Sequence, residues 1–182
     1  MQPKSEFLYA AYFCEENIWQ LANAMQSSSA KIVFISNQER QCALWNQRLA
    51  SPGKSVVWDY HVVLLEENQG SWLVYDFDSV LAWGVSLQQY LIHTFGQSVD
   101  AIFQPQFRML AATEFLTNFQ SDRRHMRDRN GRWLKPPPDW PVISNGSGHN
   151  LDQFIDMEDA APGEVYDLMQ ITEQFAQNNV AT

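Results

Sequence analysis

The chain has 182 residues, of which 45% are hydrophobic and 18% are charged, a composition that is typical of a folded globular protein and excludes extended disorder. This length suffices for one well-packed core, and the composition does not shift along the chain, so we predict a single domain spanning residues 1–182. The formal net charge is -9, with 12 Lys and Arg against 21 Asp and Glu. An acidic protein repels phosphates, so we expect no nucleic acid partner, whereas a cationic group on a substrate would be favoured.

No segment has the features of a signal peptide or of a membrane span. The first residues, MQPKSEFLYAAYF, contain a single Lys and too short an apolar stretch, and no window approaches the roughly 18 apolar residues that a span needs. We therefore expect an intracellular, cytoplasmic protein without a membrane partner, and the sequence leaves the nucleus open as a second compartment. Cys14 and Cys42 are expected to be reduced.

The first regular element is predicted to be a helix that begins near Glu15 and ends before the serines at 27–29. One face of this helix carries a row of residues at helical spacing: Cys14, Ile18, Leu21, Ala22 and Met25. Glu15 and Glu16 lie in its first turn, where acids favour the positive end of the helix dipole. Cys14 is therefore predicted to lie at or just before the helix N-terminus.

Three apolar runs predict β-strands. They are residues 31–36 (KIVFIS), 56–65 (VVWDYHVVLL) and 71–81 (SWLVYDFDSVL), and all are rich in β-branched and aromatic residues. A short polar segment, 67–70 (ENQG), separates the last two runs, so we predict that these two strands pair as an antiparallel hairpin. Asp59 and His61, near the middle of the run 56–65, are unusual residues for a buried strand.

The register of the predicted hairpin explains why these polar residues lie in an apolar strand. With the turn centred between Asn68 and Gln69, His61 lies directly opposite Asp76. The same register opposes Asp59 to Asp78, a like-charge pair that is unfavourable unless the strands separate there. The other face is almost wholly apolar and is predicted to be the core side, with Trp58, Tyr60, Val62, Leu64, Leu73, Tyr75 and Phe77.

The remainder of the chain is predicted to contain short helices and one long ordered loop. The helices are expected at 85–95, at 114–119, from a cap at Asn150 through Ile155, and at about 168–177, whereas 103–108 is expected to be a loop. Residues 121–150 are rich in Arg, Pro, Gly and Asn, which favours ordered loop over regular structure. A loop of this length in a compact domain often lines a site.

The opposition of His61 and Asp76 leads to a first hypothesis about chemistry. Side chains directly opposed in an antiparallel pair have Cβ atoms roughly 4.5 to 5.5 Å apart, so Asp76 can accept a hydrogen bond from one ring nitrogen of His61 and leave the other free. A carboxylate so placed fixes the tautomer and the orientation of the ring. A purely structural His and Asp pair within a sheet is an equally weighted alternative.

Cys14 is the candidate nucleophile. The dipole and the free N–H groups at a helix N-terminus stabilise a thiolate, a neighbouring imidazolium would lower the thiol pKa further, and the same N–H groups could bind an oxyanion. An inert buried thiol is the alternative for Cys14, and we assign that role to Cys42. The other histidines, His93, His125 and His149, form no recognisable metal pattern, so we expect no metal and no other cofactor.

Six blocks of the sequence resemble one known family. They are YFCEENIW, VFISN, VVWDYHVVLL, VYDFDSVL, FQSDRRHM and KPPPDWP, and the resemblance to the protein N-terminal glutamine amidohydrolases runs from about Tyr9 to Phe175. It implies an α+β fold, a monomeric α-β-α sandwich around a mainly antiparallel sheet with a transglutaminase-like core. It also implies that Cys14, His61 and Asp76 form a catalytic triad.

The same resemblance implies the activity. An enzyme of this family converts the side-chain amide of an N-terminal Gln of a protein or peptide to Glu, releases ammonia through a cysteine thioester, and acts in the N-degron pathway. This chain departs from the family in its short segment before Tyr9 and in its C-terminal tail, which puts only surface contacts and trafficking in doubt.

Selectivity for a chain terminus requires a partner for the substrate α-ammonium group. The acidic residues near the predicted site are Glu15, Glu16, Asp59, Asp78 and Asp122. Among the residues for substrate binding we favour Ser121 and Asp122, because their polar loop is expected to lie over the site. The alternative for Asp122 is a salt bridge to a neighbouring Arg.

Two other functions use the same features. A thiol peptidase or an acyltransferase would employ the same three residues, because both also pass through a thioester. A protein without catalytic activity could instead bind N-terminal residues in an acidic pocket. The mass of the product distinguishes the enzymes, and replacement of Cys14 by Ser would leave the binding activity of a non-catalytic protein intact.

Overall fold

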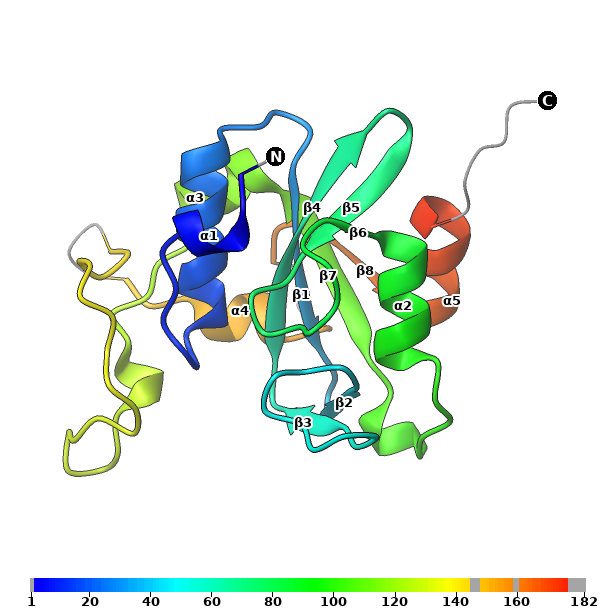
Figure 1. Cartoon of the computed structure of the whole chain (residues 1–182). Helices are drawn as coiled ribbons and strands as arrows, with labels where there is room; N and C mark the ends of the chain where they lie inside the picture. Colours follow the sequence, from blue (N-terminus) through cyan, green and yellow to red (C-terminus); the bar gives the residue numbers. More distant parts are fainter. Residues whose placement is uncertain (1, 145–147, 159–160, 177–182) are drawn as a thin grey trace.

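A six-stranded sheet forms the centre of the molecule in the computed structural model, which describes residues 2–144, 148–158 and 161–176 (Figure 1). Its strands are β1 (Lys31–Ser36), β4 (His61–Asn68), β5 (Ser71–Tyr75), β6 (Val85–Ser86), β7 (Gln106–Ala111) and β8 (Glu164–Asp167). They lie in the order β6-β5-β4-β1-β7-β8, and each neighbouring pair is antiparallel. A separate two-stranded sheet consists of β2 (Cys42–Leu44) and β3 (Val56–Trp58).

Helices cover both faces of the main sheet. Residues on one face pack against α1 (Cys14–Met25), α3 (Ala112–Asn118) and α4 (Leu151–Ile155), and residues on the other face pack against α2 (Leu87–Phe95) and α5 (Leu168–Ile171) (Figure 1). Short 3-10 turns at Lys4–Glu6, Ala101–Phe103 and Arg124–Met126 and a π-helical turn at Thr172–Ala176 complete the regular structure. None of the helices in the part of the chain that the structure describes has the length and apolar character needed to cross a membrane.

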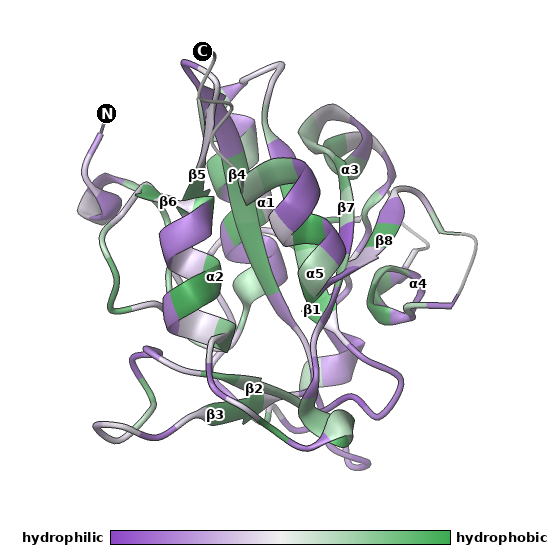
Figure 2. Ribbon diagram, turned by 90° about the vertical axis from the view of Figure 1, so that its right-hand side faces the viewer, coloured by the Kyte–Doolittle hydropathy of each residue, from purple (hydrophilic) through white to green (hydrophobic). Residues whose placement is uncertain are grey.

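The alternation of side chains along β1 explains the layered arrangement. Ile32 and Phe34 belong to the core under α1, α3 and α4, whereas Val33 and Ile35 belong to the core under α2 and α5. A strand whose two faces are both apolar requires cover on both sides, and the hydrophobic colouring along β4 in Figure 2 has the same cause. The mixed α/β content and the mainly antiparallel sheet are confirmed. The prediction that only one face of the hairpin belongs to the core is wrong.

The hairpin of β4 and β5 forms, but with a different register. Leu65 pairs with Val74 and Leu64 with Tyr75, so the strands are displaced by two residues from the predicted pairing. The cause is the turn, because Gln69 and Gly70 both adopt positive φ, which is the backbone of the two-residue turn that fits antiparallel hairpins. A displacement of two residues keeps every side chain on its predicted face.

The run 56–65 is two strands, not one. β3 leaves the main sheet to pair with β2, and β4 begins at His61. The break falls at Asp59, whose carboxylate accepts a hydrogen bond from the Tyr60 N–H (3.0 Å) and whose carbonyl accepts one from the Ser36 hydroxyl (2.7 Å). The returning strand is also shorter than predicted, because β5 ends at Tyr75 and the following residues form a loop. Asp59 and Asp78 are therefore not opposed within a ladder.

The other predicted elements have mixed outcomes. The helices α1, α2, α3 and α4 are confirmed within a few residues. The prediction of a loop at 103–108 holds for 104–105 and is wrong for 106–108, which belong to β7 and pair with β1. Asn150 precedes α4, yet its side-chain carbonyl accepts a hydrogen bond from the Gln120 N–H and not from the helix. The predicted last helix is α5 and the π-helical turn, and its final residue, 177, lies outside the described residues.

Candidate active site

Cys14 is the first residue of α1. The N-cap residue, Phe13, offers no side-chain cap, and Asn17 stabilises the helix start instead. Its amide accepts a hydrogen bond from the N–H of Ala10 and donates one to the carbonyl of Ala10, both at 2.8 Å, while Tyr12 takes the positive φ that the reversal requires. These bonds hold the chain so that Cys14 lies at the positive end of the helix, as predicted.

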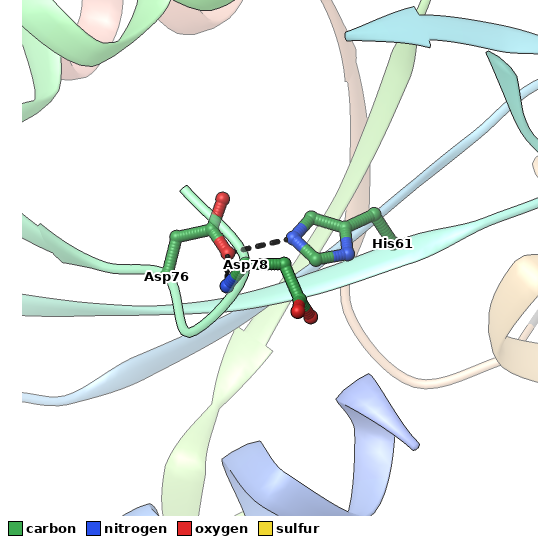
Figure 3. A group of neighbouring side chains, drawn as sticks. All are labelled: His61, Asp76 and Asp78. Atoms are coloured by element: carbon green, nitrogen blue, oxygen red, sulfur yellow. Dashed lines mark hydrogen bonds and ion pairs between the residues drawn. The ribbon is translucent and has the colours of Figure 1, made fainter. Parts of the chain in front are cut away.

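His61 and Asp76 meet where the sheet opens. The paired part of β4 and β5 ends at Leu64 and Tyr75, so the first residues of β4 and the loop after β5 are free to separate. Nε2 of His61 lies 2.9 Å from Oδ1 of Asp76, and both side chains are buried (Figure 3). The other ring nitrogen faces away from Asp76. The predicted contact thus exists, but it joins a strand end to a loop and not two opposed strand residues.

Asp76 is held by four hydrogen bonds. Oδ1 accepts from the Asp78 N–H (2.8 Å) as well as from His61, and Oδ2 accepts from the Tyr90 hydroxyl (2.9 Å) and from the Gln47 amide (3.2 Å). Sequence reasoning missed Tyr90 and Gln47. The signal for Tyr90 is a hydroxyl on the apolar face of a helix, which must find a partner when it is buried.

The electrostatics of this pair favour an ionised carboxylate and an imidazole that binds a proton readily. Burial opposes the charge on Asp76, but the charge of His61 and the hydrogen bonds lower the pKa of Asp76 to about 2. Burial alone would lower the pKa of His61, and the Asp76 carboxylate outweighs it, so the pKa of His61 lies above its ordinary value. His61 is therefore suited to accept and return a proton.

A cavity of about 330 Å³ connects the nucleophile with this pair, within the roughly 300 to 1,000 Å³ of small-molecule sites. Cys14, His61 and Asp78 line it together. Its outer wall comes from α4 and from the long segment before it, which lies on the α1 side of the sheet in Figure 1. The wall residues are His125, Met126, Leu134, Lys135, Leu151, Asp152 and Ile155. The predicted loop 121–150 therefore contributes part of the cavity wall.

The environment of the Cys14 sulfur differs from the prediction. Burial, followed by the negative charges of Glu15 and Asp78, raises the pKa of the Cys14 thiol well above its ordinary value, and a hydrogen bond from the Val62 N–H opposes this. Sγ donates a hydrogen bond to Oε2 of Glu15 at 3.8 Å. The helix N-terminus alone does not make Cys14 a thiolate in the free protein, because the next residue places a buried carboxylate beside it.

Two aromatic residues lie in places that the hairpin pattern did not predict. Trp58 was expected in the core behind His61, but its ring stacks on the His61 ring, with centroids 6.0 Å apart and an interplanar angle of 15°. Tyr60 is buried as predicted, and it also lines the cavity and donates a hydrogen bond to Oε2 of Glu15 at 2.9 Å. The break before β4 causes both differences, because it ends the alternation of side chains.

Of the residues predicted to bind substrate, Asp59 and Asp78 line the cavity. Asp59 is exposed, whereas Asp78 is buried and its Oδ1 accepts a hydrogen bond from the Tyr9 hydroxyl at 2.6 Å. Both carboxylates therefore add negative charge to the cavity.

The other predicted binding residues do not line the cavity. Glu16 is buried and forms a bidentate ion pair with Arg123, in which both N···O distances are 2.7 Å. Ser121 is buried, and its N–H pairs with the carbonyl of Ile143. Asp122 forms an ion pair with Arg124, and this pairing is the main cause that lowers its pKa to about 2. The alternative role for Asp122, a salt bridge to a neighbouring Arg, is therefore present in the structure.

His61, Asp76 and Asp78 also offer three possible metal ligands within 4.8 Å of one another (Figure 3). Hydrogen bonds already use these atoms, because both oxygens of Asp76 accept two bonds each and Oδ1 of Asp78 accepts one from Tyr9. These hydrogen bonds hold the two carboxylates in place near His61.

A larger and more open groove lies elsewhere, with a volume of about 1040 Å³. Its lining residues include Asn37, Gln104, Asp167 and Glu173, and among those described there is no Cys and no His. It offers no thiol or imidazole, so the smaller cavity is the candidate active site.

Sequence comparisons identify relatives of this chain. The family described as N-terminal glutamine amidase matches residues 9–175. A protein N-terminal glutamine amidohydrolase from Homo sapiens is 38% identical over 189 residues, which cover 97% of this chain and 92% of the relative. Proteins of the same name from Drosophila melanogaster and Danio rerio are 35% and 33% identical; the matches cover 96% and 94% of this chain and 95% and 90% of the relatives. The family match includes every residue that lines the cavity.

Proposed function

Because the chain belongs to the N-terminal glutamine amidase family, we propose that it hydrolyses the side-chain amide of an N-terminal glutamine with Cys14, His61 and Asp76 as the catalytic triad. The products are an N-terminal glutamate and ammonia. The observation that carries the proposal is that a thiol at a helix N-terminus and an imidazole held by a carboxylate line one cavity. In a cell, the new terminal glutamate would serve an N-degron pathway.

The first half of the reaction forms a thioester. Sγ of Cys14 attacks the carboxamide carbon as its proton passes to the ring nitrogen of His61 that faces away from Asp76. The N–H groups of the first turn of α1 lack acceptors within the helix and are suited to bind the oxyanion. The C–N bond then breaks, and the departing amine takes the proton from His61 and leaves as ammonia.

The second half returns the enzyme to its starting state. Water attacks the thioester carbon while His61 accepts its proton, and the C–S bond breaks as Sγ regains a proton. Asp76 keeps its four hydrogen bonds throughout and holds the ring in one orientation. Because burial and Glu15 oppose a free thiolate, the proton transfer to His61 accompanies the attack and does not precede it.

The fold supports a comparison with the transglutaminase-like enzymes. The order of the chain is a helix that begins with the nucleophile, then a strand that begins with His61, then a neighbouring strand that is followed by Asp76. In this arrangement the three residues come from three different elements, and helices cover both faces of the antiparallel sheet. We extend the proposal to a transglutaminase-like catalytic core on this ground.

Asp59 is the proposed partner of the substrate α-ammonium group. It is an exposed carboxylate of the cavity lining, two residues before His61 in the chain, and its Oδ1 accepts a hydrogen bond from the neighbouring Tyr60 N–H. Asp78, which is buried, adds negative charge nearby but is already bound by Tyr9. A cation next to these carboxylates is stabilised by charge, which favours a chain terminus over an internal glutamine.

The test compares three peptides of otherwise equal sequence: one with a free N-terminal Gln, one with the same Gln acetylated, and one with Gln at an internal position. Released ammonia and a mass gain of about one dalton are expected for the first peptide only. Turnover of all three would contradict selection by an ammonium subsite, and cleavage of the peptide would contradict the amidase reaction.

Replacement of Asp59 by Asn separates recognition from chemistry. A charged hydrogen-bonded partner is worth roughly 1.5 to 3 kcal/mol, so KM for the free peptide is expected to rise about tenfold to a hundredfold with little change in kcat. Asp122→Asn is the matched control, because it removes a carboxylate that is paired with Arg124 away from the cavity. An equal effect of both variants would contradict the assignment of Asp59.

A further inference from the structure

The carboxylate of Glu15 lies next to the Cys14 sulfur and is completely buried. Oε2 accepts hydrogen bonds from the Cys14 thiol and from the Tyr60 hydroxyl. Oε1 has no hydrogen-bond partner among the described residues. A buried carboxylate that is only half bound is costly, and its negative charge opposes a second negative charge on the neighbouring sulfur.

The imidazole of His125 lies on the unbound side of this carboxylate. Its Nε2 is 3.3 Å from Oε1 of Glu15 and 3.5 Å from the Tyr60 hydroxyl. His125 lines the same cavity as Cys14 and His61, and its Nδ1 is buried without a hydrogen-bond partner among the described residues. None of the roles assigned to the triad uses this second imidazole.

We propose that Glu15 and His125 act as a pair of positioning residues that sets the charge beside the Cys14 sulfur. With a proton on His125 the pair is neutral, and the sulfur can become negative during attack. Without that proton the Glu15 carboxylate is uncompensated and holds the proton on the thiol. This inference rests on the proposed role of Cys14 as the nucleophile, and it names how that role is controlled.

Other ionisable groups surround His125 and enter the same balance. The ring of His149 stacks on the ring of His125, with centroids 5.4 Å apart, and Nδ1 of His149 lies 3.5 Å from Oδ1 of Asp122. Arg124 pairs with Asp122 on the outer side. The other ionisable groups that line the cavity are Tyr12, Arg40, Asp59, Tyr60, His61, Asp78, Lys135 and Asp152. Only His125 contacts Oε1 of Glu15 among the described residues, so it is the group that can neutralise this carboxylate directly.

The experiment measures how the rate of Cys14 alkylation by iodoacetamide depends on pH, in the wild type, His125→Gln, Glu15→Gln and the double variant. Labelling is read by mass spectrometry on the peptide that contains Cys14, which separates it from the buried Cys42. His125→Gln is expected to raise the midpoint of the pH–rate curve for Cys14 alkylation by about one pH unit. At neutral pH this shift slows labelling roughly tenfold. Glu15→Gln is expected not to raise the midpoint, and the double variant should return it close to the wild-type value.

His149→Gln is the matched control, because it removes the stacked ring and leaves the contact between Glu15 and His125. An unchanged midpoint in His125→Gln would overturn the proposal, as would an equal rise in His149→Gln or in the double variant. If His125→Gln does not fold, a raised midpoint in the nearly isosteric Glu15→Gln would still overturn it. Labelling does not require turnover, so the expected shifts together with no release of ammonia from a Gln peptide would reject the amidase function and not the pair.

Discussion

The two sides of the cavity differ in how completely their polar atoms are bound. On the Asp76 side, both oxygens of a buried carboxylate accept two hydrogen bonds each, from His61, Asp78, Tyr90 and Gln47. On the Glu15 side, within the part of the chain that the structure describes, Oε1 of a buried carboxylate has no hydrogen bond, and neither does Nδ1 of its neighbour His125. A buried carboxylate is thus held by more hydrogen bonds on the Asp76 side than on the Glu15 side.

This difference indicates two separate tasks. A carboxylate with all its acceptor positions in use has one orientation, so it is suited to hold a ring in place during a reaction. A carboxylate with an unused oxygen next to an imidazole can be neutralised by that imidazole without breaking a network. Orientation and charge control are therefore divided between the two sides, and substitutions on each side should produce different kinetic changes.

The largest effect is expected from Cys14→Ala, which tests whether the two sides serve one reaction. Loss of a nucleophile should lower kcat for ammonia release by roughly five to six orders of magnitude, to the background rate. Cys42→Ala is the control, because Cys42 is buried in β2 and does not line the cavity. It should cost about 1 kcal/mol of stability and leave turnover per folded molecule intact. Equal turnover in both variants would exclude a thioester at Cys14.

Asp76→Asn is expected to have the next largest effect, on the Asp76 side. The amide keeps the shape of the carboxylate but presents no charge to His61, so kcat should fall by about 10³ to 10⁴ with little change in KM. The pKa of His61, followed by NMR, should fall below that in the wild type, because the charge that holds it up is lost. A loss of less than tenfold in kcat would mean that orientation does not depend on Asp76.

The acid stability of the fold tests the same carboxylate without substrate. The pKa of Asp76 is lower in the folded protein, about 2, than the roughly 3.9 of an unfolded chain. The stabilisation of the fold by the ionised Asp76 carboxylate is therefore present above pH 4 and is lost as the pH falls through 2. The difference in unfolding free energy between the wild type and Asp76→Asn should shrink by about 2 kcal/mol between pH 5 and pH 2. A constant difference in urea titrations over this range would contradict an ionised, stabilising Asp76.

Tyr90→Phe is expected to produce the smallest effect. It removes one of the two donors to Oδ2 of Asp76, worth about 1 kcal/mol, so kcat should fall by several-fold and up to tenfold. Tyr75→Phe is the matched control, because its hydroxyl donates to Glu66, away from the cavity. Both variants should lose similar stability in thermal unfolding, and only Tyr90→Phe should lose kcat.

The sequence was sufficient to predict the parts of the site that depend on local patterns. The helix start at Cys14 follows from apolar spacing and first-turn acids, and the contact of His61 with Asp76 was predicted despite the wrong register. The contact forms although the ladder ends at Leu64 and Tyr75, because the loop after β5 brings Asp76 back to the start of β4. The break at Asp59 was not predictable, because residues 56–65 have equal strand preference on both sides of it.

The parts that depend on distant segments could not be predicted from local patterns. The partners of Glu16 are Arg123 and Trp140, which lie 107 and 124 residues away. The helix dipole alone already accounts for an acid at this position, so no local pattern indicates these partners. The same holds for Glu15, whose first-turn position predicts a stable helix and not a buried charge beside the nucleophile. Segments of loop carry no periodicity from which such contacts could be inferred.

The buried ion pair of Glu16 and Arg123 also bears on the order in which a newly made chain acquires activity. Cys14 precedes the segment that walls its cavity by more than a hundred residues, and that segment is tied to the neighbouring Glu16 through Arg123 and Trp140. Synthesis proceeds from the N-terminus, so more than a hundred residues must follow the nucleophile before its surroundings can close. A nascent chain that ends before Arg123 therefore carries the Cys14 thiol without the segment that walls the cavity, and cannot yet form the site.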